Sequence, residues 1–455
     1  MKPRLCLIAL VLLAVLVPLG ATEAAQFNFL PEMNFGLTYS DNIFLDPDNE
    51  EDDFITAVGV SLTGEVLWPT AGLELNYAPS YNWYAQNSEE DFWRHTARFT
   101  AWKEYRRNTR FEFRNSFLYT QDPVDSSDVV DADDPLSRPD IESDPNRRGL
   151  NTFYTNVSEA RVSHRFGAQD QAFGGLRYRI LREVDSVAEE ENSDESDIWE
   201  PFVGFAYWFD VRWGIQVNGL YSHRDFKDRT DREEYTGNAM LIRQFGRHLS
   251  AFVDYQHTYL DFDSDFDLDP DEEPESDYNV YAPSGGIRYQ IEENAEITIG
   301  LGYFWQKFED NEFNDDEEGF FINSQIFKTW PFRRGFFKLL GSSGYAIDDA
   351  GSEDLGLTIY YEGRATAGYN FTTRLAGDLF TGYRWDDYPD EEPDRTDKTL
   401  TAGAGLNYQA LRWMNLRLEY NFRDLSSDND ENEYTENRVM FIVTLAPTQP
   451  FRLNR

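Results

Sequence analysis

Residues 54–83 read FITAVGVSLTGEVLWPTAGLELNYAPSYNW, and this stretch decides the fold. The first run places its larger or apolar residues on even positions: Phe54, Thr56, Val58, Val60, Leu62, Gly64, Val66 and Trp68. After a tight segment at 69–72, the second run places them on odd positions: Leu73, Leu75, Tyr77, Tyr81 and Trp83. A period of two is typical of a pleated strand, whose successive side chains point to opposite faces, and does not suit a helix.

Both runs are longer than the usual soluble strand of about five or six residues. They are long enough for a strand that crosses a bilayer, which needs roughly 9–11 residues. Aromatic residues gather at the ends of the runs, where a bilayer has its interfaces. The stretch therefore predicts a transmembrane β-hairpin, and the same unit repeats to the end of the chain.

The N-terminal segment 1–25 is predicted to be a secretory signal peptide. Lys2 and Arg4 precede an apolar run that ends at Leu19, and small residues follow up to Ala25. The apolar run is short for a membrane span of about 20 residues, so we favour a cleaved signal over an uncleaved anchor. Cys6 is the one cysteine of the chain and lies in this segment, so the mature chain would hold no disulfide and no cysteine-ligated metal.

The composition combines strong acidity with many aromatic residues. The formal net charge of −42 suits a soluble acidic protein, but an aromatic content of 16% is high for a disordered acidic chain. Aromatic girdles are typical of membrane barrels. No run of about 18 apolar residues follows Ala25, so no transmembrane helix is predicted.

About twenty strands follow one another, joined alternately by short turns and long acidic loops. The long loops are 46–53, 85–91, 122–150, 183–197, 223–234, 261–277, 309–318, 348–354, 386–397 and 424–433. Strict alternation places all long loops at one end of the sheet. In bacterial barrels the long loops are extracellular, the short turns are periplasmic and the strand number is even.

We therefore predict an all-β fold, a transmembrane antiparallel up-and-down β-barrel, over residues 26–447. It has about 20 strands, with 18 as the alternative, and residues 448–455 form a short periplasmic tail. A soluble β-sandwich would show the same alternation, but its strands would be about half as long.

The segment Tyr39-Ser40-Asp41-Asn42-Ile43-Phe44, followed by Asp53-Phe54-Ile55-Thr56, resembles the putative β-barrel porin 2 family. The resemblance is specific over about the first hundred residues and architectural after that. It implies an exported barrel in the outer membrane of a Gram-negative bacterium, of a kind often linked to exopolysaccharide systems. Outer-membrane barrels often end on an aromatic residue, whereas this chain runs on to Arg455.

Arginines recur on the strand faces opposite the apolar ones, which face the lumen if the apolar faces contact lipid. One group lies on four consecutive predicted strands: Arg94, Arg98, Arg114, Arg161, Arg165, Arg177 and Arg179. A second group lies on the last five: Arg364, Arg374, Arg384, Arg417, Arg423 and Arg438. Charge lining a low-dielectric channel concentrates counter-ions, so these groups predict an anion-attracting path.

Cross-strand ion pairing is the alternative role for these arginines. Carboxylates stand on the same predicted faces: Glu74, Glu112, Glu159, Glu362, Asp378 and Glu419. Opposite charges that face each other in a sheet stabilise it modestly. Pairing and conduction are compatible, and we favour pairing as the first role.

Two long loops offer further interpretations. The loop 122–150 is the third outward loop; it can fold inward and narrow the pore, or project into the medium, which we favour.

In the loop 261–277, Asp261, Asp263, Asp265 and Glu272 match positions 1, 3, 5 and 12 of a calcium loop. Phe266 stands where that loop needs Gly, so this is not an EF-hand, and a solvated charge run is the simpler interpretation.

The sequence offers little support for catalysis. His223 and Asp225 form the one close His–Asp pair on the outer rim, and no phosphate loop or nucleophile elbow is present. Acidic loops would repel nucleic acid. We therefore predict a pore for hydrophilic, anionic solutes, with exopolysaccharide export as the specific version.

The alternative is a non-conducting surface protein whose acidic loops bind Ca²⁺, Mg²⁺ or a partner. The predicted contacts of either protein are outer-membrane lipid and lipopolysaccharide, whose phosphates loop-bound cations would bridge. No other cofactor is predicted, and the sequence makes no prediction of the oligomeric state.

Overall fold

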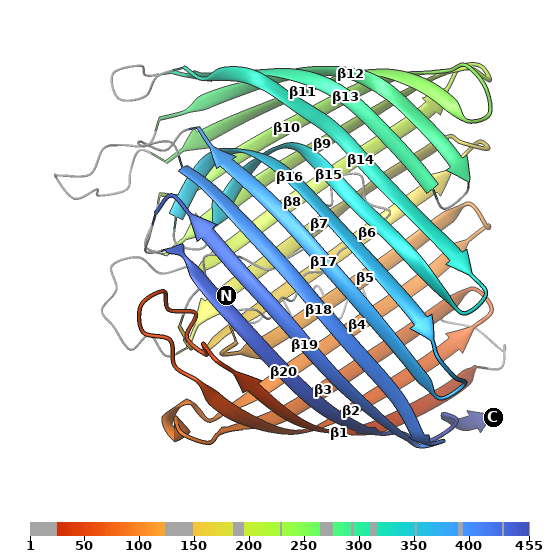
Figure 1. Ribbon diagram of the computed structural model, residues 1–455. Helices are drawn as coiled ribbons and strands as arrows, with labels where there is room; N and C mark the ends of the chain where they lie inside the picture. Colours follow the sequence, from red (N-terminus) through yellow and green to blue (C-terminus); the bar gives the residue numbers. More distant parts are fainter. Residues whose placement is uncertain are drawn as a thin grey trace.

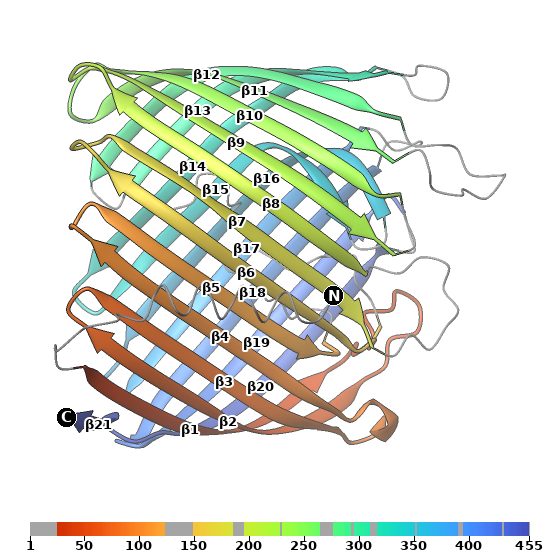
Figure 2. The ribbon, with the colours of Figure 1, turned by 180° about the vertical axis from the view of Figure 1, so that it is seen from behind.

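The computed structural model describes residues 25–122, 149–184, 195–227, 230–263, 276–292, 295–309, 316–350, 353–389, 395–429 and 432–454. Twenty long strands form one antiparallel sheet that closes into a barrel, and a short strand follows them (Figures 1 and 2). The predicted fold and strand number are confirmed. No helix among the described residues is long and apolar enough to cross a membrane.

The first ten strands are β1 (Gln26–Ser40), β2 (Asp53–Trp68), β3 (Ala71–Tyr84), β4 (Phe92–Tyr105), β5 (Thr109–Thr120), β6 (Phe153–Arg165), β7 (Gln171–Glu183), β8 (Ser196–Trp208), β9 (Trp213–Phe226) and β10 (Arg232–Gln244). The others are β11 (Leu249–Phe262), β12 (Tyr278–Glu292), β13 (Ala295–Phe308), β14 (Glu318–Phe332), β15 (Gly335–Ala350), β16 (Glu353–Asn370), β17 (Leu375–Tyr388), β18 (Arg395–Leu411), β19 (Met414–Ser427), β20 (Tyr434–Leu445) and β21 (Phe451–Asn454). The loop between β3 and β4 also holds a short 3-10 helix, η1 (Ser88–Glu90).

The opening hairpin is formed by β2 and β3, as its alternation predicts. The two strands pair from Ile55 with Tyr84 to Trp68 with Ala71. The even-numbered residues of β2 and the odd-numbered residues of β3 point outward; Leu62 is 39% exposed and Leu75 is 50% exposed. Apolar side chains on the outside suit contact with lipid, while the opposite faces line the lumen.

The barrel closes along β1. Residues 33–40 of β1 pair with residues 438–445 of β20, while the earlier residues 26–29 pair with β21. Pro447 and Pro450 lie between β20 and β21, where a missing backbone N–H interrupts strand pairing. Part of the predicted tail 448–455 thus extends the closing seam; its periplasmic location stays a prediction, and the predicted signal peptide, apart from Ala25, lies outside the described residues.

One hairpin departs from the regular barrel. The pairing of β14 with β15 stops at Ser324 and Ser343, and that of β16 with β17 stops at Ile359 and Asp387. Beyond these points β15 and β16 pair only with each other, up to Ala350 and Glu353. We call residues 344–350 and 353–359 the inner hairpin, because this end of β15 and β16 leaves the wall and folds into the lumen (Figures 1 and 2).

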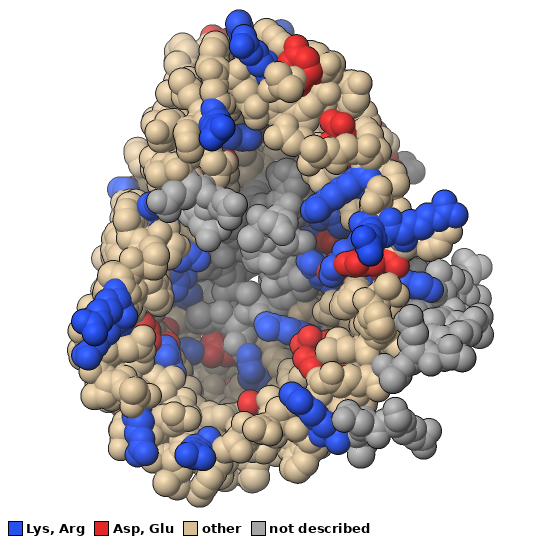
Figure 3. All heavy atoms as spheres, turned by 90° about the vertical axis from the view of Figure 1, so that its right-hand side faces the viewer, with Lys and Arg blue, Asp and Glu red and all other residues tan. Residues whose placement is uncertain are grey.

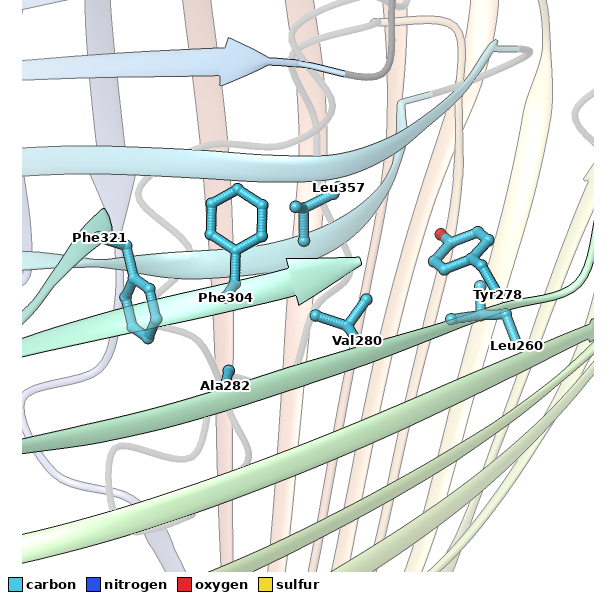
Figure 4. Close-up of a cluster of buried hydrophobic side chains, with 7 residues drawn as sticks. All are labelled: Leu260, Tyr278, Val280, Ala282, Phe304, Phe321 and Leu357. Carbon is cyan, nitrogen blue, oxygen red and sulfur yellow. The ribbon is translucent and has the colours of Figure 1, made fainter. Parts of the chain in front are cut away.

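The inner hairpin packs on an apolar part of the lumen wall. Six buried side chains of β11 to β14 form this surface, which we call the apolar seat: Leu260, Tyr278, Val280, Ala282, Phe304 and Phe321 (Figure 4). Leu357 of the inner hairpin is buried in the same cluster, and its neighbours Tyr345, Ile347 and Ile359 pack against it. By alternation these four hairpin residues belong to the faces predicted to contact lipid, which is wrong, because they pack in the lumen and an apolar lumen surface satisfies the same pattern.

Candidate solute path

The first arginine group lies together on the lumen wall. Arg94 and Arg98 stand on β4, Arg114 on β5, Arg161 and Arg165 on β6, and Arg177 and Arg179 on β7. These four strands pair consecutively, from β4 with β5 to β6 with β7. The structure therefore brings the seven residues to one sector of the barrel, as the spacing predicts. Their role in conduction stays a prediction.

Carboxylates neutralise much of this sector through a cross-strand ladder. Arg114, Glu159, Arg177 and Glu200 are direct partners on the consecutive strands β5 to β8. Nη2 of Arg177 lies 3.0 Å from a carboxylate oxygen of Glu159, and Nη1 lies 3.8 Å from one of Glu200. Arg114 also pairs with Glu112. Alternating opposite charges on adjacent strands stabilise the sheet and reduce the net field in the lumen.

Other members of the first group lie beside aromatic rings or near an open surface. The Arg161 guanidinium lies 4.4 Å from the centre of the Phe173 ring and 5.9 Å from that of Phe202. Arg98 is exposed on β4, between Asn76 and Ser116 of its neighbouring strands. Arg165 is exposed at the last position of β6, and Arg94 and Arg179 are half-buried.

The second group is also largely paired. Arg384 on β17 lies 2.7 Å from a carboxylate oxygen of Asp386, and Arg417 on β19 lies 2.6 Å from one of Glu419 and 3.2 Å from one of Asp378. The remaining members are placed as follows: Arg364 on β16 lies over the Phe380 ring at 4.6 Å, Arg374 stands in the turn after β16, Arg423 stands on β19, and Arg438 of β20 pairs with Glu436 and Asp122.

The expected pairing is thus found for five carboxylates and fails for one. Glu112, Glu159, Asp378, Glu362 and Glu419 each contact an arginine, Glu362 at 4.0 Å from Arg384. Glu74 of β3 has no basic partner within the described residues and faces Glu65 of β2 across the sheet. Glu65 and Glu74 are thus like charges directly opposite each other, an arrangement that destabilises a sheet.

Sequence reasoning missed several charged residues of the lumen. Arg224 lies 3.2 Å from Glu234, and Arg395 lies 2.9 Å from Asp397, whose own side chain is almost fully buried. Arg232 is 1% exposed. All stand near the long-loop end of their strands. These positions were predicted to lie in the loops 223–234 and 386–397, so their place on the inward-facing side of a strand was not recognised.

The short-turn end of the barrel carries a ring of arginines, which we call the basic rim (Figure 3). The turn segments that the structure describes hold Arg106, Arg107, Arg212, Arg247, Arg333, Arg334, Arg374 and Arg412, against the two carboxylates Asp170 and Asp210. Within the described residues none of these eight guanidinium groups has a carboxylate partner. The basic rim therefore keeps its charge, unlike the lumen wall.

One rim turn carries two arginines at backbone conformations that arginine rarely adopts. Arg106 and Arg107 have φ values of 54° and 60°. This left-handed region favours Asn or Gly, and it costs other residues about 1–2 kcal/mol each. The Asn-Gly pair typical of such a hairpin turn is replaced by two arginines, so the turn gains charge at the expense of stability.

A cavity of about 450 Å³ opens in the basic rim, between the turns that follow β16 and β18. We call it the mouth cavity. Arg374 and Arg412 line it together with Trp413, whose side chain is half exposed. Asn407 and Asn415 also line it, and their amide groups have no side-chain partner among the described residues. The cavity thus offers two unpaired cations, free amides and an aromatic face.

The long-loop end has the opposite charge. Among the described residues that connect the strands at this end, Lys227 is the only basic residue, while most of the connections carry carboxylates. Desolvation and the neighbouring charge of Glu89 raise the pKa of Glu90 in the loop before β4. Of the predicted calcium ligands, Asp261 is the second-to-last residue of β11 and Asp263 follows the strand, while Asp265 and Glu272 lie outside the described residues.

The two ends of the loop 122–150 are held at this acidic end. Asp122 accepts a hydrogen bond of 2.8 Å from Arg438 of β20. Gly149 donates its backbone N–H to the carbonyl of Phe44, and Leu150 packs with Ile43. The body of the loop, 123–148, lies outside the described residues, so its predicted outward course stays a prediction. Among the described residues no group of three or more potential metal ligands occurs.

Comparison with known proteins supports the sequence-based family. The model of the family described as putative beta-barrel porin 2 matches residues 222–446. The predicted family is confirmed, although the matched residues lie in the second half of the chain and not in the first hundred residues. No curated protein matches the chain.

Solved structures with a similar outline include proteins of Pseudomonas aeruginosa and Acinetobacter baumannii. Pseudomonas aeruginosa OccK2 (OpdF) is 13% identical with a TM-score of 0.41, over 92% of this chain and 98% of that chain. P. aeruginosa OccK8 (OprE) is 14% identical with a TM-score of 0.42, over 92% and 98%. Acinetobacter baumannii OccAB4 is 12% identical with a TM-score of 0.38, over 94% and 100%. At these values the likeness carries no argument about function.

Proposed function

This chain belongs to the putative beta-barrel porin 2 family, and from that premise we propose that it passes hydrophilic anionic solutes across the Gram-negative outer membrane. Family and fold indicate a channel rather than an enzyme. The finer proposal is export of an acidic glycan, such as an exopolysaccharide, that enters from the periplasmic end. The observation that supports it is the basic rim with its unpaired arginines.

Unpaired charge at a pore mouth raises the local concentration of counter-ions. The effect reaches about one Debye length, roughly 8 Å at physiological ionic strength. The eight rim arginines lie in the turns that follow β4, β8, β10, β14, β16 and β18, at the end of the barrel where Figure 3 shows Lys and Arg side chains around the opening. An anion would therefore be enriched at the periplasmic end before it meets the lumen.

The lumen wall suits passage better than retention. Conduction requires binding that is favourable enough for entry and weak enough for exit. Arg114, Arg177, Arg384 and Arg417 are compensated by carboxylates, so the wall offers hydrogen bonds without a strong net field. At the far end the acidic loops repel anions and favour their release into the medium.

The mouth cavity supports an acidic sugar as the class of solute. A guanidinium group matches a carboxylate with two parallel hydrogen bonds, and Arg374 and Arg412 both stand unpaired in the cavity. The flat face of Trp413 can cover the apolar face of a sugar ring, while Asn407 and Asn415 can bond its hydroxyl groups. A cavity of about 450 Å³ is within the range of small-molecule sites.

Ion preference in planar bilayers tests the proposal. The barrel with Arg106→Glu, Arg107→Glu, Arg374→Glu and Arg412→Glu is compared with unchanged barrel under a salt gradient. We expect anion preference in the unchanged barrel and its loss or reversal in the variant. The matched control replaces the same four residues by Lys, which keeps the charge and should keep the preference. An unchanged reversal potential in the Glu variant would refute the proposal.

The second candidate is a non-conducting surface protein that binds divalent cations. It is favoured by the carboxylates at the long-loop end, where desolvation and then the charge of Glu89 raise the pKa of Glu90. Cations held there would bridge the loops to lipopolysaccharide phosphates, because both offer oxygen ligands. A folded barrel without conductance but with saturable calcium binding would favour this candidate over the pore.

A further inference from the structure

We propose that the inner hairpin is a two-state constriction: it lies inward on the apolar seat in the narrow state and joins the barrel wall beside β14 in a wide state. The proposal concerns the size of the pore and not the charge of its solute. It rests on the proposed function only in that the barrel is a channel, and not on the anion preference proposed above.

The inward hairpin leaves the edge of β14 without a strand partner. Residues 318–323 of β14 pair with β13 on one side, and within the described residues no strand pairs with their other side. The hydroxyl of Ser343 donates to the carbonyl of Ile322 at 2.6 Å, at the point where the two strands separate. Unpaired strand edges are costly in a membrane, so pairing of this edge favours a return of the hairpin to the wall.

The register of β14 and β15 can continue without any shift. The last observed pair, Ser324 with Ser343, would be followed by Asn323 with Gly344 and then Ile322 with Tyr345. Two residues further, Phe320 would face Ile347. The outward faces agree as well, because Ile322 and Phe320 are exposed on the lipid side, at 43% and 69%. Tyr345 and Ile347 would join them there.

The same apolar face of the hairpin therefore fits two environments. In the wall it would contact lipid, and on the seat it contacts Val280, Leu260 and their neighbours, which are fully buried. The Tyr345 ring lies 5.1 Å from that of Phe321 on β14. A face that is apolar in both places gives the element two packed positions, as a switch requires.

The apolar seat favours the inward state. Leu260, Val280 and Phe304 stand on the lumen side of their strands, where water would otherwise meet them. Covering them with the hairpin removes apolar surface from water, and this gain opposes the cost of the unpaired β14 edge. A solute shifts the balance toward the wide state only as far as it binds that state more tightly.

A disulfide tests whether the hairpin reaches the wall. In a chain with Cys6→Ser, Phe320→Cys and Ile347→Cys would face each other only in the wide state, with Cα atoms about 5.5 Å apart, which a disulfide accommodates. The control pair is Ser324→Cys and Ser343→Cys, whose hydroxyl groups are 2.7 Å apart and which cross-links in either state. We expect both pairs to cross-link in membrane-inserted barrel under mild oxidation, the control faster.

Conductance tests whether the hairpin narrows the pore. Locking the first pair should raise single-channel conductance at least about 1.5-fold, since a two-stranded ribbon about 10 Å wide leaves the lumen. Reduction of the disulfide should reverse the gain. The seat variant Leu260→Ser/Val280→Ser should give more frequent visits to the same wide level, while Leu301→Ala on the lipid face of β13 should not.

Three results would overturn the proposal. The first is the absence of a cross-link in the Phe320–Ile347 pair under conditions that fully oxidise the control pair. The second is a cross-link without any change in conductance, which would show that the hairpin moves but does not constrict. The third is a seat variant that folds, as judged by heat-modifiable migration, and keeps the conductance of the unchanged barrel.

Discussion

The lumen of this barrel has two unlike regions, the apolar seat covered by the inner hairpin and the charged wall of β4 to β8 and β16 to β20. Both belong to strands with the same outward alternation, and they differ only in the residues that point inward. The inner hairpin packs on Leu260, Val280 and Phe304, whereas the wall around Arg177 and Glu159 stays in contact with water. The inward residues therefore decide which part of a wide barrel is filled and which stays open.

The largest effect is expected where the seat loses volume. Phe304→Ala removes a side chain that is 2% exposed, and substitutions of this kind cost about 3–5 kcal/mol. The cost falls on the attachment of the inner hairpin and not on the whole barrel. Hydrogen exchange of the backbone amides of residues 344–347 and 356–359 should therefore accelerate strongly.

The control for this variant is Leu301→Ala on the same strand. Leu301 is 57% exposed on the lipid face and does not touch the hairpin cluster. Exchange in the inner hairpin should stay unchanged in this control. Equal exchange in Phe304→Ala and Leu301→Ala would contradict the role of the seat.

A smaller effect is expected in the charged wall. Arg177→Met leaves Glu159 and Glu200 close together without their cation, on strands where their side chains are 9% and 11% exposed. The loss should be about 2 kcal/mol, below the 3–5 kcal/mol of a fully buried pair, because lumen water screens the remaining charges. Urea unfolding in lipid vesicles, followed by tryptophan fluorescence, measures it.

Removing the carboxylates together with the arginine should restore much of the loss. Arg177→Met combined with Glu159→Gln and Glu200→Gln leaves no uncompensated charge. Arg98→Met, at an exposed position of the same wall, should change the unfolding free energy little. A single Arg177→Met variant as stable as the unchanged barrel would show that the ladder contributes nothing.

The smallest effect is expected in the basic rim, and its sign is opposite. Arg106→Asn with Arg107→Gly should stabilise the barrel by about 1 kcal/mol, because the new residues tolerate the positive φ of this turn. The same change should weaken anion preference. Arg333→Asn with Arg334→Gly removes equal charge from a turn without positive φ, so it should weaken the preference without the gain in stability. If the two pairs change stability alike, the strained turn is not the cause.

The alternation that residues 54–83 show, repeated along the chain between short turns and long loops, was enough to predict the strands, their number and the two ends of the barrel. It could not predict the inner hairpin, because Tyr345 and Leu357 satisfy the pattern against lipid and against an apolar lumen surface equally well. The sequence does contain the missing signal, since Leu260, Val280 and Phe304 are apolar at positions whose alternation faces inward. Only the structure shows that β15 leaves β14 after Ser343 and that the hairpin then packs on these inward-facing residues.

The sequence predicted that arginines and carboxylates pair on the lumen wall, but it did not identify every partner. Opposite charges on adjacent strands indicated partners such as Glu159 for Arg177, whereas Glu200 escaped notice because strand register cannot be read from alternation alone. The basic rim was visible in the dipeptides Arg106-Arg107 and Arg333-Arg334. Its importance depends on the absence of partners among the described residues, which only the structure reveals.

Accessibility of single cysteines to a water-soluble, charged thiol reagent tests the division of the lumen most directly. In a chain with Cys6→Ser, Arg98→Cys stands on the exposed charged wall and Val280→Cys in the fully buried seat. We expect rapid modification at position 98 with a stepwise fall in single-channel conductance, and at position 280 only slow modification limited by hairpin opening. Rapid modification at position 280 together with no effect at position 98 would show that the seat is open to solutes and the charged wall is not, and would contradict the account.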